Sequence, residues 1–407
     1  MKFSSFLTEQ QNAHMEHLED MIFNDGVDGA RLAITSLQSL RDMLAGRSKK
    51  AVNVTVKWDG APAIFAGVDP SDGKFFVAKK GIFNVNPQLF KSEADIVKEL
   101  SGDLQTKFKI ALREFSKLGI RKGVYQGDLM FTKGDVKIAT IDGSKYYTFQ
   151  PNTIMYAVPV NSALGKFIAK ASIGVVWHTT YTGNRIQSMS ASFGKGIVSK
   201  MKKVRTVWMD DATYKDVSGN ATFTSDETAE ITALLSQAGS IFKSVSSSVL
   251  STIRDDEELK QKIKTFNNTF VRAGVPFPKP DKHVKGLYTY ISEWYQKEID
   301  KKKQEKTKKE WMDRRDVVLK KVFQNTDELV NIFRLMNVLI QAKQMVIDKM
   351  NYAGKMGTFL RTNSGLEVTN QEGYVAIDRM GKAIKVVDRM EFSRANFSPD
   401  VLKGWQK

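Results

Sequence analysis

The sequence contains no cysteine, few histidines and no uninterrupted apolar run long enough to cross a membrane. Without cysteine, a disulfide scaffold, a thiol nucleophile and a Cys-based zinc or iron–sulfur site are all excluded. The four histidines are scattered, which argues against a histidine metal cage: His14, His17, His178 and His283. For His178, which follows Trp177 on an expected strand, a structural role is favoured over acid–base chemistry.

The most membrane-like stretch, residues 157–177, is interrupted by Lys166 and Lys170. Each charge placed deep in a bilayer costs about 2.5–3.5 kcal/mol, so this stretch is not expected to span a membrane. The first residues turn polar too early for a secretory signal. We therefore expect a soluble monomer in the cytoplasm, or in the host cytoplasm if the protein is viral.

The 407 residues are 42% hydrophobic and 10% aromatic, which is enough to bury real cores and suggests two or three domains. The 62 Lys and Arg residues outnumber the 45 Asp and Glu residues, giving a formal net charge of +17. Such a surplus favours a polyanionic partner, because neutralising phosphates releases condensed counterions.

The spacing of apolar residues changes three times along the chain, between helical and strand-like patterns, and this predicts an α+β protein. Four regions are expected: a helical segment at 1–48, a strand-rich unit at 49–215, a helical domain at 216–354, and a return to short strands at 355–407. The helical domain is inserted inside a strand-rich unit and is the expected contact for nucleic acid.

Helix ends in the inserted domain are predicted from capping signals. Thr224 with Glu227, and Asn325 with Glu328, have the spacing of capping boxes, and Gly239 is a candidate C-terminal cap. The highly charged run 300–315 is expected to be a helix. Its interspersed Lys and Glu are typical of a solvated face, whereas its cationic excess leaves a nucleic-acid contact open.

The sequence Lys57-Trp58-Asp59-Gly60 ends an expected strand. Because side chains alternate along a strand, Lys57 and Asp59 are expected on one side and Trp58 in the core. Gly60 allows a turn or a close approach of the backbone. A lysine amine attacks only when it is unprotonated, so a catalytic role needs surroundings that favour the neutral form.

These four residues resemble motif I of the covalent nucleotidyltransferases, the superfamily of polynucleotide ligases and RNA-capping guanylyltransferases. Later segments resemble further motifs in the same order. They are residues 76–81 (the basic strand after motif I), 124–129 (motif III), 153–157 (motif IIIa), 372–376 (motif IV) and 384–388 (motif V). The tract 372–392 is particularly similar to bacteriophage RNA ligases.

The resemblance implies a nucleotidyltransferase core of antiparallel sheets with an added helical domain and without a C-terminal OB-fold. It implies an ATP-dependent ligase that joins 5′-phosphate and 3′-hydroxyl ends through a lysyl-AMP intermediate. ATP, Mg²⁺ and nucleic acid, either a nicked duplex or RNA ends, would be its cofactors and partner. Whether the polymer is DNA or RNA stays open.

The resemblance also assigns roles to single residues. Lys57 would be the nucleophile, and Lys385 and Lys80 would be cations on phosphate. Tyr156 would stack on adenine, with Phe149 as the alternative. The remaining nucleotide-binding positions would be Thr55, Asp59, Gly60, Asp128 and Glu372, and the two carboxylates Asp128 and Glu372 could hold Mg²⁺. Lys79 and Lys80 face opposite sides of a strand, so only one of them can reach the site.

The chain departs from the family pattern at three positions. Pro62 stands where these families commonly have Arg, Asp128 where they usually have Glu, and Val387 where motif V often has a second Lys. Lys382, Lys385 or Arg389 would then share the motif V task. Two other functions stay open: an RNA-capping-type guanylyltransferase, and a catalytically inactive ligase-fold protein that binds nucleic acid.

Overall fold

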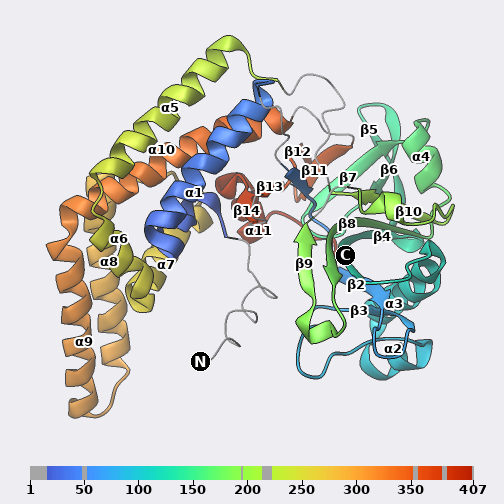
Figure 1. Cartoon of the computed structure of the whole chain (residues 1–407), viewed down its shortest axis with the longest axis horizontal. Helices are drawn as coiled ribbons and strands as arrows, with labels where there is room; N and C mark the ends of the chain where they lie inside the picture. The colour runs from blue at the N-terminus through green and yellow to red at the C-terminus, as the bar shows by residue number, and fades with distance from the viewer. Residues whose placement is uncertain are drawn as a thin grey trace.

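The computed structural model describes residues 16–47, 53–193, 196–212, 222–351, 356–377 and 383–405. The protein is α+β and has two lobes, one built of helices and one rich in strands, as Figure 1 shows. The boundaries expected at 48, 215 and 354 all lie outside the described residues, as does His14.

The helical lobe combines an N-terminal helix with the inserted helices, all seen on the left of Figure 1. After the short η2 (Leu18–Asp20), its helices are α1 (Met21–Leu44), α5 (Ser225–Ser244), α6 (Ser247–Asp255), α7 (Glu257–Ala273), α8 (Pro280–Asp300), α9 (Glu305–Gln324) and α10 (Thr326–Asn351). Helix α1 packs against α5, α6 and α10 around one apolar core. The N-terminal helix is therefore an integral part of this lobe.

Local signals explain some helix ends and not others. The capping box at Thr224 forms, since its hydroxyl accepts the Glu227 N–H at 3.2 Å and the Glu227 carboxylate accepts the Thr224 N–H at 2.7 Å. The prediction at Gly239 was wrong, because α5 continues past it to Ser244. The second expected box is also absent, because the Glu328 carboxylate accepts the N–H of Ser246 instead.

The strand-rich lobe contains two larger sheets. The six-stranded sheet has the order β10-β8-β4-β2-β3, with β9 also paired to β8: β2 (Ala63–Val68), β3 (Phe75–Ala78), β4 (Val124–Thr132), β8 (Ile173–Thr182), β9 (Ser190–Phe193) and β10 (Val207–Asp211). Only the β8–β10 pair is parallel among the described strands. Helices α2 (Glu93–Glu99) and α3 (Gly102–Phe115), with η3 (Ser116–Leu118), follow β3, and α3 covers one face of this sheet.

The second sheet has five strands in the order β12-β11-β7-β6-β5. They are β5 (Lys137–Ile141), β6 (Ser144–Phe149), β7 (Ile154–Pro159), β11 (Gly357–Thr362) and β12 (Gly365–Val368), and α4 (Ala163–Ile168) packs on β6 and β7. Strand β11 follows the helical insertion and pairs antiparallel with β7. The chain therefore returns to the strand-rich lobe after the helices, as the sequence pattern predicts.

A small three-stranded sheet lies between the lobes (Figure 1). Its order is β1 (Asn53–Lys57), β13 (Gly373–Ile377) and β14 (Ala383–Val386), all antiparallel, and α11 (Arg389–Phe397) follows β14. One face is apolar and packs on the helical core through Val54, Tyr374, Ala376, Ile384 and Val386. The alternation of strand side chains leaves the other face to Thr55, Lys57 and Lys385.

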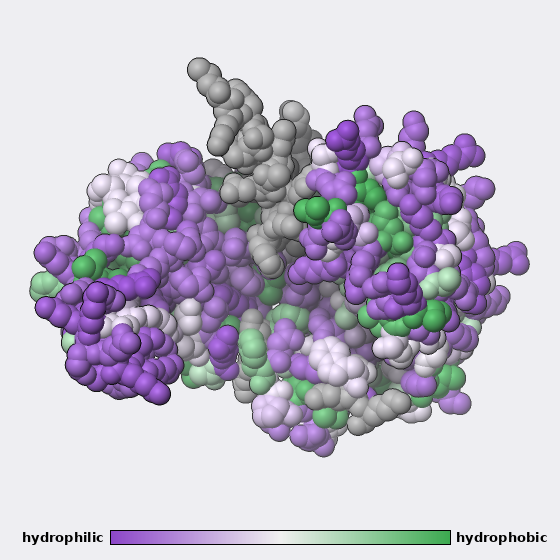
Figure 2. All heavy atoms as spheres, turned by 90° about the horizontal axis from the view of Figure 1, so that it is seen from below, coloured by the Kyte–Doolittle hydropathy of each residue, from purple (hydrophilic) through white to green (hydrophobic). Residues whose placement is uncertain are grey.

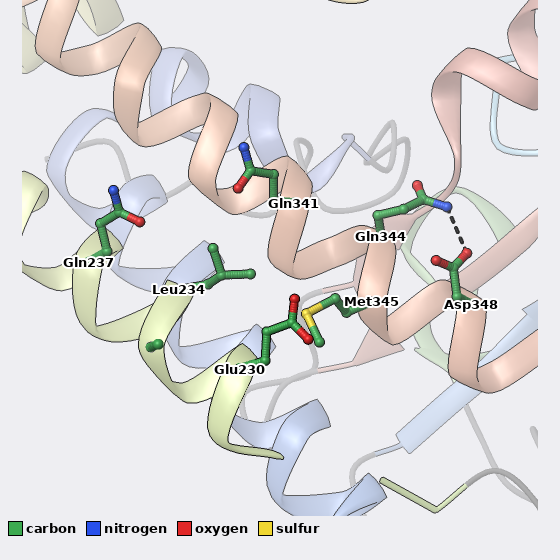
Figure 3. Close-up of a pocket in the computed structure, with 8 residues that line it drawn as sticks. Glu230, Leu234, Gln237, Gln341, Gln344, Met345 and Asp348 are labelled. Atoms are coloured by element: carbon green, nitrogen blue, oxygen red, sulfur yellow. Dashed lines mark hydrogen bonds between the residues drawn. The ribbon is translucent and has the colours of Figure 1, made fainter. Parts of the chain in front are cut away.

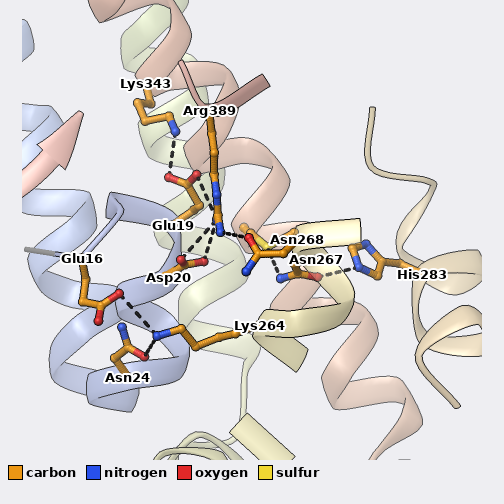
Figure 4. Close-up of polar contacts among 11 residues, drawn as sticks. Glu16, Glu19, Asp20, Asn24, Lys264, Asn267, Asn268, His283, Lys343 and Arg389 are labelled. Atoms are coloured by element: carbon orange, nitrogen blue, oxygen red, sulfur yellow. Dashed lines mark hydrogen bonds and ion pairs between the residues drawn. The ribbon is translucent and has the colours of Figure 1, made fainter. Parts of the chain in front are cut away.

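A buried polar network joins the N-terminal turn η2 to the helical lobe and to α11 (Figure 4). Lys343 pairs with Glu19 at 2.8 Å, and each side chain is only 2% exposed. Arg389 contacts the carboxylate oxygens of Asp20 at 3.1 and 3.2 Å. Burial alone would raise the pKa of Glu19, but Lys343, His17 and Arg389 together outweigh burial and hold that pKa at about 2. Both charges of the Glu19–Lys343 pair are thus kept inside the fold.

Removing one partner of this pair leaves an uncompensated buried charge. We expect Lys343→Met to lower the free energy of unfolding by about 3–5 kcal/mol. Urea unfolding followed by circular dichroism measures this loss. The double variant Glu19→Met, Lys343→Met should recover much of it, because no charge is then buried alone.

Lys301→Met is the matched control, because Lys301 pairs with Glu298 while its side chain is 66% exposed. An exposed pair contributes at most about 1 kcal/mol. If Lys343→Met were no more harmful than Lys301→Met, the buried pair would not be a structural requirement.

Candidate functional site

Lys57 and Glu372 meet where β1 ends and β13 begins. The antiparallel register places Lys57 opposite Gly373, so the residue just before β13 lies at the end of the Lys57 side chain. The Lys57 amine forms an ion pair with the Glu372 carboxylate across 315 residues of sequence. The two side chains are 25% and 10% exposed, so the pair is largely shielded from solvent.

Lys385 shares this face of the three-stranded sheet. It lies opposite Val375, and on the other side of β13 the same Val375 lies opposite Thr55. Thr55, Lys57 and Lys385 therefore project from one face. Burial lowers the pKa of Lys385 and the charge of Lys57 lowers it further, while Glu372 acts in the opposite direction. The motif-like segments that contain Lys57, Glu372 and Lys385 are thus brought together in one small sheet.

Asp128 faces the same region from β4. Gly60 lies so close to β4 that a Cβ added to it would come within 2.5 Å of the Asp128 Cβ, which explains why a glycine is needed there. Burial raises the pKa of Asp128 to about 7, against the opposing effect of Lys57. Burial likewise raises the pKa of Glu372 to about 7, again with Lys57 working against it.

His178 joins the site through a β-bulge in β8. The register shifts between Gln126 and Gly127 of β4, so His178 has no residue opposite it. Its Nε2 lies 3.8 Å from an Asp128 carboxylate oxygen, and its Nδ1 lies 2.7 Å from the Thr179 hydroxyl. Burial lowers the pKa of His178 to about 4, with a further contribution from Lys57. The sequence pattern favours a structural role for this residue; its hydrogen bond to Thr179 fits that role, and its ring also lies beside Asp128.

Asp59 does not project alongside Lys57 as the strand pattern predicts. Strand β1 ends at Lys57, so the alternation does not reach Asp59. Its buried carboxylate instead accepts hydrogen bonds from Asn152 Nδ2 at 2.6 Å and from the N–H groups of Thr153 and Ile154 at 2.7 and 2.6 Å. Asp59 therefore anchors the segment before β7 to the end of β1.

Tyr156 lies in the core. Its hydroxyl accepts the Asp59 N–H at 2.9 Å, and its ring stacks on Phe149 with centroids 5.6 Å apart. Tyr156 is 1% and Phe149 2% exposed, so neither ring has a free face for an adenine. Trp58 packs against Tyr156 in the same cluster, as expected for its inward position. A half-buried ring that does lie beside Lys57 is Phe392 of α11, whose centroid is 6.0 Å from the amine.

Two other expected cations lie elsewhere. Lys80 is exposed in the turn after β3, and within the described residues no hydrogen bond or ion pair links it to Lys57, Glu372 or Asp128. Arg389 is buried against Asp20 and takes no part in the face that carries Lys385. Lys382 lies outside the described residues.

A separate hollow lies between α5 and α10 on the helical lobe (Figure 3). It is lined by Glu230, Ala233, Leu234, Gln237, Gln341, Gln344, Met345 and Asp348. This lining has two carboxylates and no cation, so it does not favour the phosphates of a nucleotide.

The cluster around Lys57 combines cations with carboxylates. Lys57 and Lys385 offer positive charge, and Asp128 and Glu372 offer carboxylates. Within the described chain no group of three or more His, Asp and Glu side chains is arranged to hold a metal ion. Mg²⁺ at a phosphate site commonly uses one or two carboxylates together with water and substrate oxygens, and Asp128 and Glu372 fit that pattern.

A protein-family model described as a family of unknown function, DUF6267, matches residues 12–400. The chain belongs to the DUF6267 family. The match spans both lobes of this DUF6267 protein, including Lys57, Asp128, Glu372 and Lys385. No curated protein and no solved structure matches it. Among the helices of the described residues, none has the length and apolar character needed to cross a membrane.

The raised pKa of Asp128 makes the stability of this DUF6267 protein depend on pH. The folded state holds the proton between the ordinary pKa of 3.8 and about 7, whereas the unfolded state releases it, so this contribution to stability falls as pH rises through that range. Relative to wild type, Asp128→Asn should gain stability with rising pH, by at most about 1.4 kcal/mol per pH unit. Urea unfolding at several pH values measures the difference.

His178→Gln provides a control of opposite sign. Because the pKa of His178 is lowered from 6.5 to about 4, the unfolded state binds the proton more readily between these values and wild-type stability rises with pH. The Gln variant should therefore lose stability relative to wild type over that range. If the stability difference between each variant and wild type did not change with pH, Asp128 and His178 would have the same pKa in the folded and unfolded states.

Proposed function

We propose that this DUF6267 protein is an ATP-dependent polynucleotide ligase with a nucleotidyltransferase core, and that Lys57 carries AMP. The observation that supports this most is the Lys57–Glu372 ion pair, formed between two motif-like segments at opposite ends of the chain. Lys385 on the same sheet face and Asp128 on β4 complete a charged cluster around that pair.

The first step uses the groups around the amine. The Lys57 ammonium must lose a proton before it attacks, and Glu372 contacts it with a pKa of about 7, which suits a carboxylate that accepts a proton near neutral pH. The amine nitrogen then forms a bond to the α-phosphorus of ATP as the bond from that phosphorus to the bridging oxygen breaks. Lys385 stabilises the negative charge that grows on the departing pyrophosphate.

The later steps follow from the same class of reaction. AMP passes from Lys57 to a 5′-phosphate end, and a 3′-hydroxyl then displaces AMP to seal the strand. The motif wording is similar to that of RNA ligases, whereas a formal net charge of +17 suits a nicked duplex. A comparison of substrates is therefore needed to decide between DNA and RNA.

A second candidate is a ligase-fold protein that binds nucleic acid without catalysis. The observation that favours it is the burial of Tyr156 and Phe149, which leaves the adenine without the aromatic face expected from the resemblance. Catalysis is favoured by the presence of four charged groups: Lys57, Lys385, Asp128 and Glu372.

Self-labelling separates these functions. The protein is first treated with pyrophosphate to discharge any bound AMP, then incubated with Mg²⁺ and α-labelled ATP or GTP, and denatured. We expect label from ATP that is lost in Lys57→Ala, because the proposal assigns the attack to that amine. Lys145→Ala, which removes an exposed lysine from β6, is the matched control and should keep the label.

Each other outcome has a definite meaning. Label from GTP alone would identify a guanylyltransferase, and no label from either nucleotide would favour the binding protein. Where ATP does label Lys57, sealing of nicked DNA, nicked RNA–DNA hybrids and single-stranded RNA identifies the polymer.

Lys385 should affect the rate of labelling more than the binding of ATP. Loss of a group that stabilises developing charge typically costs about 10²–10³-fold in rate. We expect Lys385→Ala to slow formation of the labelled protein by that factor, with partial recovery in Lys385→Arg. Single-turnover labelling at saturating ATP measures this, and an unchanged rate would remove Lys385 from the proposed chemistry.

A further inference from the structure

A basic ridge lies on the strand-rich lobe, away from the motif-like residues. It consists of Arg113 and Lys117 at the end of α3 and η3, and of Lys200, Lys202, Lys203 and Arg205 in the segment before β10; all six are exposed. The second segment belongs to a longer tract, residues 143–209, which contains nine Lys or Arg and no Asp or Glu. The positive charge of this tract is therefore not offset by acidic residues of the same tract.

A buried carboxylate holds the two segments of the basic ridge together. Glu114 is 3% exposed, contacts Arg113 at 3.1 Å and Lys117 at 2.7 Å, and accepts a hydrogen bond from the Thr206 hydroxyl at 2.6 Å. The Lys202 N–H donates to the Leu118 carbonyl at 2.8 Å. These contacts fix the positions from which the cations extend.

The apolar layer beneath the basic ridge is continuous with the core of the lobe. Ile197, Met201 and Val207 from one segment pack with Phe115 and Leu118 from the other. The basic ridge is therefore fixed on a packed core and is not a loose charged loop. Less conformational entropy is then lost when a partner binds to it.

Four of the six ridge cations have no acidic partner among the described residues. Within the described chain no carboxylate forms an ion pair with Lys200, Lys202, Lys203 or Arg205. The charged run at 300–315 is different, because five of its eight cations are paired with acids: Lys301, Lys302, Lys308, Arg314 and Arg315. Hydrophilic residues dominate the visible face of the helical lobe, on the left of Figure 2. The paired charges of that run are typical of a solvated surface, whereas most cations of the basic ridge are unpaired in the described part of the chain.

We propose that the basic ridge binds the sugar–phosphate backbone of nucleic acid. Backbone binding needs exposed cations and no apolar insertion, and none of the large exposed hydrophobic residues of the described chain lies at 113–122 or 197–206. A protein partner or a lipid surface would normally gain affinity from apolar contacts, which the ridge does not offer. This proposal and the proposed function have one element in common, which is nucleic acid as the partner.

The basic ridge and the Lys57 cluster lie on opposite sides of the six-stranded sheet. Trp177 packs in the core layer beneath the ridge, together with α3. The adjacent His178 faces Asp128. The ridge therefore holds nucleic acid at a distance from the reacting groups and does not bind the phosphates of ATP. Its loss should leave self-labelling of Lys57 unchanged.

Salt-dependent binding tests this. A fluorescein-labelled nicked DNA duplex is titrated with the full-length protein at several NaCl concentrations, and anisotropy gives the binding constant. Each phosphate contact contributes about 0.9 to the slope of log K against log salt. The triple variant Lys202→Ala, Lys203→Ala, Arg205→Ala should reduce the magnitude of that slope by about 2–3 and weaken binding most at low salt.

The matched control is Lys303→Ala, Lys306→Ala, Lys309→Ala. It removes the same charge from three exposed positions of the other basic run. A wild-type slope in the ridge variant overturns the proposal, and if the control variant loses slope instead, the contact belongs to the helical lobe. Binding to phosphatidylserine vesicles in the absence of duplex binding also overturns it.

Self-labelling with α-labelled ATP keeps this test apart from the proposed function. If the ridge variant loses duplex binding but is labelled like wild type, both ideas stand. If wild type binds the duplex through the ridge but is never labelled, only the covalent chemistry fails.

Discussion

The charged site depends on the antiparallel pairing of β1 with β13, which holds Lys57 against Glu372. The paired strands come from opposite ends of the chain, and the helical insertion lies between them. The entropy cost of closing so long a loop grows only with the logarithm of its length, so the insertion is tolerated. What stabilises the small sheet is its apolar face, which buries Tyr374 and Ile384 in the helical core.

Charged groups inside this molecule are of two kinds, those with a close partner and those without enough opposite charge nearby. Between Glu19 and Lys343 each charge has a close partner, and the pKa of the carboxylate is held low. Around Lys57 the carboxylates of half-buried Asp128 and buried Glu372 have too little positive charge nearby, so the partial loss of water contact raises the pKa of each to about 7. The first arrangement fixes a structure, whereas the second leaves protons that can move near neutral pH, as is common at functional sites.

The sequence pattern predicted the order of the elements better than the direction of single side chains. Strand periodicity and motif order identified β1, β13 and β14, and a capping signal placed the start of α5 correctly. The inward position of Tyr156 could not be read from the sequence, because an aromatic residue in an apolar strand fits a core or a pocket equally well. His178 needed the bulge in β8, which depends on the register with β4 and leaves no local signal. Asp59 differed because β1 ends two residues earlier than the alternation assumed, and Glu328 because a tertiary partner, Ser246, competes for its carboxylate.

The place of β13 late in the chain has a consequence for biosynthesis. On a translating ribosome β1 emerges early, but its partner strand follows only after α10 has been made. Until then the nascent polypeptide carries Lys57 on an unpaired strand with no Glu372 beside it and no Lys385 on a neighbouring strand. Assembly of the charged cluster therefore requires translation through β13 and β14, and a truncated product that stops within the helices lacks it.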